Sequence, residues 1–377
     1  MKKILIFIDW YLPAYKAGGP IISVKNIIEH LSTKFDFYIV TSNLDIDNFE
    51  VVDKSDLNKW ISKNGYSIIY LNNKNQNISF YKEIVDNLNP SIVYLNSFFS
   101  FKFSILPILA SRNNKSISKI ILAPRGMLGK GAIKIKWLKK FLFIKTMNFI
   151  NFYSNIDWHA STNNESIEIK NLFGNNSKIS VAQNLSGFKY SKFKAHKVKH
   201  GFLKVLFVSR ISEKKNLLFL IESINLCENK NQINLTIIGF QQDKTYFKLC
   251  SDLLDKYQIS YEFLGSIPHN QLSNYYLSSD IFCLPTLHEN YGHVITEALS
   301  FGLPILISRN TPWTQLEDKQ IGFDLPLVYS LFSSKIDFFY SLSDDSFSDY
   351  SKNAIYFFNK INPTKKLIKD NINLFSQ

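Results

Sequence analysis

Short apolar runs alternate with amphipathic stretches along almost the whole of this 377-residue chain. Many of the runs are apolar at consecutive positions, so both faces of a strand formed there would be buried, as in a parallel sheet covered by helices. Strands that alternate with helical stretches are typical of βαβ units. The pattern therefore predicts an α/β protein built from doubly wound, Rossmann-like sheets.

The alternation falls into two blocks. In the first block we expect strands at 4–8, 37–41, 67–71, 92–96, 120–123, 157–160 and 179–182, with helices at 23–31, 80–88, 134–149 and 165–173. In the second block we expect strands at 204–209, 235–239, 261–265, 281–285 and 304–308, with helices at 217–227, 246–257, 270–277 and 293–301. The basic, weakly periodic segment 187–201 lies between the blocks, which predicts domains at 1–186 and 202–349 joined by a linker. Because ligands of open α/β sheets bind at the carboxyl ends of the strands, we expect the site in a cleft that both domains face.

The net charge of +13, with an isoelectric point of about 9.3, favours an anionic partner: nucleotide phosphates, nucleic acid or an acidic membrane surface. No zinc-finger, RNP or helix-turn-helix signature supports nucleic acid. Cys227, Cys250 and Cys283 are scattered, and neither cysteines nor histidines have the spacing of metal ligands, so we expect no metal. The apolar run after Lys3 ends at Asp9, too early for a signal peptide, and no stretch reaches the roughly 18 apolar residues of a membrane span. These features predict a cytoplasmic protein.

The segment 288–304 follows an expected buried strand and contains an E-x7-E pair. Glu289 would lie on the strand-to-helix loop and Glu297 inside the helix, with an anion site at the free amides near Gly292 and His293. In that setting Glu297 suits the hydroxyls of a ribose, and Glu289 suits sugar hydroxyls and a developing oxocarbenium charge. An isolated pair of this kind is more often a solvated glutamate and a helix charge favoured by the macrodipole. The complete string favours function.

A basic loop, 208–216, follows the first expected strand of the second block. Arg210 and Lys215 leave the carboxyl end of that strand, where they are suited to neutralise a diphosphate, Arg by bidentate hydrogen bonds and Lys as a point charge. A solvated basic loop is the commoner fate of such residues. The position at the carboxyl end of a strand favours function here.

Two loops of the first block supply further candidates. After the first strand, Gly18 and Gly19 permit a close backbone approach to a donor, and Lys16 beside them is a candidate on the acceptor side. After the strand at 120–123, Arg125 is a second acceptor-side candidate. The glycines belong to neither a Walker nor a G-x-G-x-x-G string, so by themselves they specify no ligand.

The stretch 130–149 mixes lysines with Trp137 and other large apolar residues, as a basic amphipathic helix does. One interpretation is a surface that lies on an anionic membrane and admits a lipid-linked acceptor. The other is an ordinary surface helix in a Lys-rich chain.

Taken together, these strings resemble the retaining glycosyltransferases of family 4, also called glycosyl transferases group 1, over nearly the whole chain. The matching positions are the basic pair, the E-x7-E pair with its following Gly-x-Pro, and the glycine loop: Arg210, Lys215, Glu289, Glu297, Gly18 and Gly19. The strings 124–128, 268–271 and 311–313 look like those of bacterial members that build surface polysaccharides.

The resemblance implies the GT-B fold, with two Rossmann-like domains facing a central cleft and the C-terminal segment 350–377 crossing back onto the first domain. It implies that Glu289 contacts the donor sugar and that Glu297 binds ribose. Backbone amides of the intervening loop would hold sugar and phosphate: Asn290, Tyr291, Gly292, His293 and Val294. It also implies front-face attack with no protein nucleophile, no metal and no other cofactor. Many members have a histidine where this chain has Arg125, so the role of Arg125 stays open.

The activity expected from the resemblance is transfer of a hexose, with retention, from a nucleoside-diphosphate sugar to a glycan or lipid-linked glycan in cell-surface polysaccharide assembly. A nucleotide-sugar epimerase or a phosphorylase on the same scaffold, a nucleic-acid-binding protein and a catalytically inactive partner subunit are the alternatives. The joint presence of the basic pair and the E-x7-E pair argues against an inactive subunit.

Overall fold

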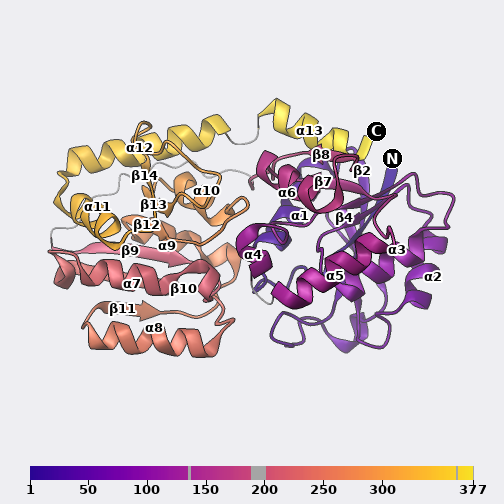
Figure 1. Ribbon diagram of the computed structural model, residues 1–377, viewed down its shortest axis with the longest axis horizontal. Coiled ribbons are helices and arrows are strands. Elements are labelled where there is room, and N and C mark those ends of the chain that lie inside the picture. The colour runs from indigo at the N-terminus through magenta and orange to yellow at the C-terminus, as the bar shows by residue number, and fades with distance from the viewer. Residues whose placement is uncertain (135–136, 188–200, 362–363, 377) are drawn as a thin grey trace. The chain divides into compact units, whose positions relative to one another are not determined.

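The computed structural model describes residues 1–134, 137–187, 201–361 and 364–376. The chain divides into two compact units (Figure 1). The first unit is Met1–Gly187 with Pro363–Gln377, and the second is Phe188–Asn362. The predicted linker, 187–201, falls almost wholly outside the described residues.

The sheet of the first unit has the strand order β3-β4-β2-β1-β5-β6-β7-β8, and only the pair of β3 with β4 is antiparallel. The strands are β1 (Lys2–Phe7), β2 (Phe35–Ser42), β3 (Trp60–Lys63), β4 (Tyr66–Leu71), β5 (Ile92–Leu95), β6 (Lys119–Leu122), β7 (Asp157–Ala160) and β8 (Ile179–Val181). All but β3 were predicted. The residues of β3 are largely exposed at the sheet edge, so its sequence contains no apolar run.

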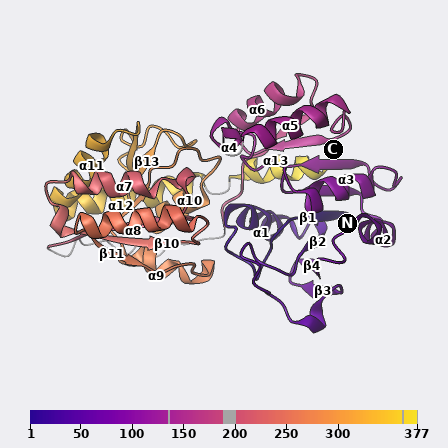
Figure 2. The same ribbon diagram turned by 60° about the horizontal axis from the view of Figure 1, so that its bottom comes forward.

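Helices cover both faces of this sheet (Figure 2). They are α1 (Gly19–Leu31), α2 (Ile78–Leu88), α3 (Leu106–Ser111), α4 (Lys130–Lys134), α5 (Trp137–Phe149), α6 (Asn163–Phe173) and α13 (Lys365–Ser376). Alternate residues of β1 enter two cores: Leu5 and Phe7 pack with α2, α3, α5 and α6, whereas Ile4 and Ile6 pack with α1 and α13. A strand that serves two helix layers must be apolar at successive positions, which is the pattern of the sequence.

The second unit has an all-parallel sheet in the order β11-β10-β9-β12-β13-β14. Its strands are β9 (Leu203–Val208), β10 (Ile233–Ile238), β11 (Ser260–Phe263), β12 (Ile281–Leu284), β13 (Ile305–Ser308) and β14 (Gly322–Leu325). Its helices are α7 (Leu217–Asn225), α8 (Lys244–Lys256), α9 (Ser273–Ser278), α10 (His293–Ser300), α11 (Tyr329–Ser341) and α12 (Asp344–Ile361), with one-turn helices η3 (Glu213–Lys215), η4 (Lys230–Gln232) and η5 (His269–Gln271). The sequence did not predict β14, whose short run begins with glycine and contains Asp324.

The C-terminal segment divides between the units, so the prediction that 350–377 packs on the first domain was wrong for α12. Phe347, Ala354 and Phe358 of α12 are buried in the core of the second unit. In contrast, Leu374 and Phe375 of α13 are buried in the first unit. Both helices have the same amphipathic spacing, and spacing does not specify which core a helix covers.

No helix in the described ranges combines the length and the apolar character needed to cross a lipid bilayer.

Candidate functional site

Two loops of the second unit meet at the carboxyl ends of β9 and β12, which are neighbours in the sheet. The backbone N–H of Leu287 donates to the carbonyl of Lys214 at 2.8 Å, and Asn216 Nδ2 donates to the carbonyl of Pro285 at 3.0 Å. The strand order reverses between β9 and β12, which is where open α/β sheets bind ligands. The fold thus brings the predicted basic loop and the predicted glutamate loop together.

Lys215 and Glu289 form an ion pair across these two loops, with Lys215 Nζ donating to Glu289 Oε2. Both side chains are mostly withdrawn from solvent. Burial by itself raises the pKa of Glu289, but the charges of Lys215 and Lys214 outweigh it, and the net shift is downward. Glu289 is therefore ionised at neutral pH, and Lys215 balances its charge.

Arg210 follows β9 directly and lies close enough to Glu289 for the two charges to interact. Burial lowers the pKa of Arg210, while the charge of Glu289 opposes that shift. A guanidinium remains protonated at neutral pH even so. Among the described residues, none forms a hydrogen bond or ion pair with this guanidinium. With Lys215 already balancing Glu289, the group of three side chains has one net positive charge, which suits an anionic ligand.

Gly292 caps the start of α10 in a left-handed conformation, with φ 81°. A side chain is strained at this φ, and a Cβ would also lie 2.8 Å from Ile295 Cδ1, so the turn favours glycine. No side chain caps the helix. The first amides of an α-helix are not bonded within the helix, so the start of α10 at His293 and Val294 is suited to an anion.

Tyr291 and Asn290 precede Gly292 on the loop that leads into α10. The ring of Tyr291 is buried edge-on to His293, and its carbonyl accepts a hydrogen bond from Trp313 Nε1 at 2.5 Å. Tyr291 therefore anchors the loop, and only its amide is left for a ligand. Asn290 is half-buried on the same loop.

Glu297 lies in α10 and has two partners that sequence reasoning did not assign. His269 Nε2 lies 2.8 Å from Oε1, and the hydroxyl of Tyr276 donates to Oε2 at 3.0 Å. Burial raises the pKa of Glu297, but His269 and Tyr276 bring it below its ordinary value. The ring of Tyr276 stacks on Phe301 at 5.2 Å, which fixes the hydroxyl. Glu297 is thus ionised and fixed in position, and its oxygens can accept further hydrogen bonds.

Comparison with known proteins relates this chain to glycosyltransferases. Residues 189–320 match the family model described as glycosyl transferases group 1. The chain is similar to an uncharacterized glycosyltransferase of Methanocaldococcus jannaschii, with 29% identity over 105 residues, or 28% of this chain and 26% of the relative. The match thus spans about a quarter of that relative's length.

Solved structures are similar over the whole chain. Sucrose-phosphate synthase from Thermosynechococcus elongatus has a TM-score of 0.75 at 14% identity, covering 100% of this chain and 98% of that one. HepE of Anabaena, solved in complex with UDP-glucose, has a TM-score of 0.71 at 13% identity and covers 100% of both chains. The chain has the GT-B fold. Fold and family match together support a glycosyltransferase enzyme.

The glycine loop of this GT-B chain opens α1 in the first unit. Gly18 has φ 72°, and a Cβ at Gly18 or Gly19 would meet no atom within 4 Å. The space beside the glycines is therefore open, and only the backbone angle of Gly18 requires glycine. Lys16 forms an ion pair with Asp47 at 2.6 Å. Since that carboxylate already balances its charge, the structure favours a role for Lys16 in holding the loop.

Arg125 of the GT-B first unit belongs to an internal network. Its guanidinium donates to Asn184 Oδ1 at 2.5 Å, to Asn96 Oδ1 at 2.9 Å and to the hydroxyl of Tyr94 at 2.7 Å. The Tyr94 hydroxyl lies 2.7 Å from His159 Nδ1, and His159 Nε2 lies 2.8 Å from a backbone carbonyl. Burial and the charge of Arg125 lower the pKa of His159 to about 3. His159 is therefore neutral, with its proton on Nε2 and Nδ1 accepting from Tyr94.

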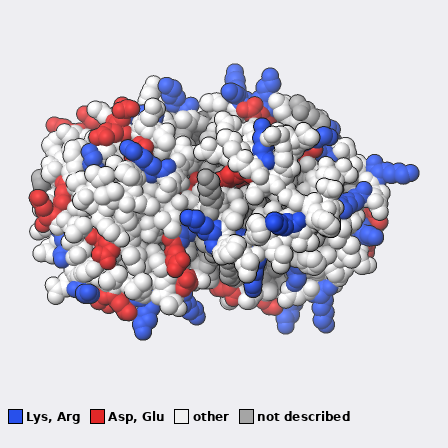
Figure 3. All heavy atoms as spheres, viewed as in Figure 1, with Lys and Arg blue, Asp and Glu red and all other residues white. Residues whose placement is uncertain are grey.

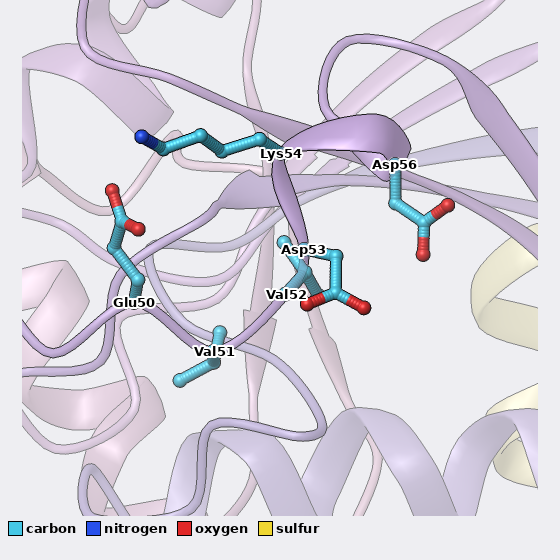
Figure 4. Close-up of a pocket in the computed structure, with 6 residues that line it drawn as sticks. All are labelled: Glu50, Val51, Val52, Asp53, Lys54 and Asp56. Carbon is cyan, nitrogen blue, oxygen red and sulfur yellow. The ribbon is translucent and has the colours of Figure 1, made fainter.

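Two other features of the first unit lie outside every predicted motif. Asp9, just after β1, accepts a hydrogen bond from Ser100 Oγ at 2.6 Å, and burial raises its pKa. A cavity of about 570 Å³ is lined by the loop residues Glu50, Val51, Val52, Asp53, Lys54 and Asp56 (Figure 4). No predicted site residue lines this cavity.

Proposed function

We propose that the protein is a retaining hexosyltransferase that takes a nucleoside-diphosphate sugar as its donor. The observation that carries the proposal is the guanidinium of Arg210, which is partly buried beside the Lys215–Glu289 pair and forms no hydrogen bond or ion pair with a described residue. A partly buried guanidinium whose hydrogen-bond donors are not used by the protein is suited to bind an anionic ligand. The similarity to HepE, solved in complex with UDP-glucose, supports a nucleoside diphosphate.

The donor is held by charges and amides of the second unit. Arg210 binds the diphosphate by bidentate hydrogen bonds, and Lys215 adds a point charge that it shares with Glu289. The amides of His293 and Val294 complete the phosphate site. Glu297 accepts hydrogen bonds from the ribose hydroxyls, and Glu289 contacts the sugar.

The transfer step follows from these roles. The bond between the anomeric carbon and the diphosphate breaks, and the electron pair goes to the leaving phosphate oxygen. Arg210 and Lys215 stabilise that developing charge, while Glu289 stabilises positive charge on the sugar ring. The acceptor hydroxyl attacks from the same face and gives its proton to the leaving phosphate. The new bond joins the acceptor oxygen to the anomeric carbon, and the step needs neither a protein nucleophile nor a metal.

The acceptor is a glycan or lipid-linked glycan of a cell-surface polysaccharide, and the protein works in the cytoplasm, in peripheral contact with the membrane. The open space at Gly18 and Gly19 supports ligand approach to the first unit. Arg125 positions the loops of that unit through its network with Asn184, Asn96 and Tyr94, and it stays a candidate on the acceptor side. Nucleic acid is not a partner.

A thermal-shift screen against UDP, GDP, ADP, pyrophosphate and an oligonucleotide tests the proposal. A nucleoside diphosphate at a hundredfold its Kd adds about 2.7 kcal/mol of stability to the wild type. Arg210→Ala removes that gain. Lys248→Ala, which removes an exposed cation of α8, keeps it. A response to the oligonucleotide alone would overturn the assignment. Consumption of a nucleotide sugar without any acceptor would favour an epimerase.

A further inference from the structure

We propose that the outer face of α5 (Trp137–Phe149) is a docking surface for an anionic lipid membrane. The helix lies along the outside of the first unit (Figure 1). It is apolar on two opposite faces. Ile144 is buried in the core, and Phe143 and Met147 pack partly against it. Surface helices normally have one apolar stripe, the one that faces the core.

The second stripe faces solvent. Leu138, Phe141, Leu142 and Phe149 are 63%, 47%, 65% and 88% exposed. Phe141, Leu142 and Phe149 lie three, four and eleven residues after Leu138. This spacing places all four side chains along a single side of the helix. Soluble proteins rarely leave such a contiguous set of large apolar side chains in water unless it binds something.

Two neighbours extend the stripe. Trp137 is 59% exposed, with its ring 6.3 Å from that of Phe141, and the exposed Ile150 follows the end of the helix. Tryptophan is the residue that most favours the boundary between lipid and water, because its ring is apolar and its N–H is polar. The outer face of α5 thus offers aliphatic and aromatic groups side by side.

The segment that contains the stripe has charges of one sign. No Asp or Glu occurs between Asp86 and Asp157. Lys139 and Lys145 are exposed on α5, and Lys145 Nζ lies 4.8 Å above the ring of Phe141. Figure 3 shows this side of the first unit as mostly uncharged, with separate basic groups. An apolar stripe flanked by lysines matches the surface of a bilayer that contains anionic lipid.

A second copy of the chain fits this face less well. In a twofold dimer the same patch meets itself, so the lysines of one copy would face those of the other with no carboxylate on the patch to pair them. Nucleic acid fits less well too, because Leu138 and Leu142 offer nothing to a base edge or a phosphate. This surface specifies which part of the protein makes the membrane contact of the proposed function. Membrane binding by α5 does not depend on sugar transfer.

Flotation of the full-length protein with vesicles tests the docking surface. One set of vesicles has equal parts of phosphatidylglycerol and phosphatidylcholine, and the other has phosphatidylcholine alone. We expect binding to the first set only, weakened when NaCl is raised from about 0.1 M to about 0.5 M. Leu138→Ser/Leu142→Ser should weaken binding at least about tenfold. Lys139→Gln/Lys145→Gln should weaken it roughly 30-fold, at about one kcal/mol for each lysine.

The matched control is Leu249→Ser/Tyr356→Ser, which removes two exposed apolar side chains of the second unit and should bind as the wild type does. Equal binding of the α5 variants and the control would overturn the proposal. The proposal would also be overturned if the protein bound no vesicles and instead formed dimers that are lost in Leu138→Ser/Leu142→Ser. Binding to an oligonucleotide in place of vesicles would overturn it as well. A UDP titration of each variant, expected to be unchanged, separates failure of this surface from failure of the donor site.

Discussion

Glu297 Oε1 lies 2.8 Å from His269 Nε2, which fixes this carboxylate on α10, four residues after the helix begins at His293. We expect Glu297→Gln to weaken UDP binding at least tenfold, because hydrogen bonds to a charged acceptor contribute about 1.5–3 kcal/mol. Binding of inorganic pyrophosphate, which has no ribose, should not change. Isothermal titration with both ligands makes the comparison, with the exposed Glu317→Gln as control. Equal losses for both ligands would contradict the ribose role.

Glu289→Ala should separate binding from turnover. The variant loses the sugar contact, and transfer should fall at least about 100-fold, the size of effect seen when a preorganised electrostatic group is removed. The affinity for UDP should stay the same or rise, because Lys215 is released from its carboxylate partner. Transfer assays and a UDP titration measure the two quantities. Near-normal transfer would rule out the assigned role.

Gly292→Ala should lower the free energy of unfolding by more than the strain of a positive φ alone. At Gly265, which also has a positive φ, a Cβ would meet no atom within 4 Å, so Gly265→Ala measures the cost of the conformation, about 1–2 kcal/mol. At Gly292 the new Cβ would also press on Ile295 Cδ1 at 2.8 Å and Glu289 Cγ at 3.1 Å. We expect a lower unfolding temperature and weaker UDP binding for Gly292→Ala, and normal UDP binding for Gly265→Ala. Loss of binding in both variants would remove the steric explanation.

Tyr94→Phe should destabilise the first unit by about 1–3 kcal/mol. The lost hydroxyl leaves the buried Nδ1 of His159 without its donor and takes one acceptor from Arg125. Chemical denaturation measures the effect, and Tyr356→Phe, on a ring that is mostly exposed, is the control. UDP binding should be unchanged in both variants. A stable Tyr94→Phe protein that has lost transfer would instead give this network a direct part in catalysis.

Asp280→Asn should stabilise the protein at alkaline pH. Burial raises the pKa of Asp280 to about 6 from 3.8, against the opposing hydrogen bond from the backbone N–H of Lys204 at 2.7 Å. The folded chain therefore holds this proton more tightly than the unfolded chain. The resulting stabilisation is complete below pH 3.8 and is lost as the pH rises through 6. At pH 8 the variant avoids the buried charge and should gain up to about 3 kcal/mol.

Thermal melts of wild type and Asp280→Asn across this range make the test. The difference between them should shrink as the pH falls below 6. A constant difference at every pH would mean that the carboxyl does not titrate in this way.

The sequence by itself determined the strand–helix alternation, most of the strands and the two loops that supply the basic pair and the glutamate pair. These features are local, because a run apolar at successive positions specifies a strand buried on both faces wherever it lies in the sheet. The edge strand β3 and the short β14 escaped prediction for the same reason. One is exposed and the other begins with glycine, so neither contains a long apolar run.

Only the tertiary structure decided which residues meet. Lys215 pairs with Glu289 across two loops, and His269 and Tyr276 hold Glu297. Arg125 is held by Tyr94 and Asn96 at the end of β5 and by Asn184 after β8. It also decided that α12 packs in one unit and α13 in the other. These relationships depend on strand order and crossover connections, and a one-dimensional pattern of apolar and polar residues does not encode distances between segments far apart in the chain.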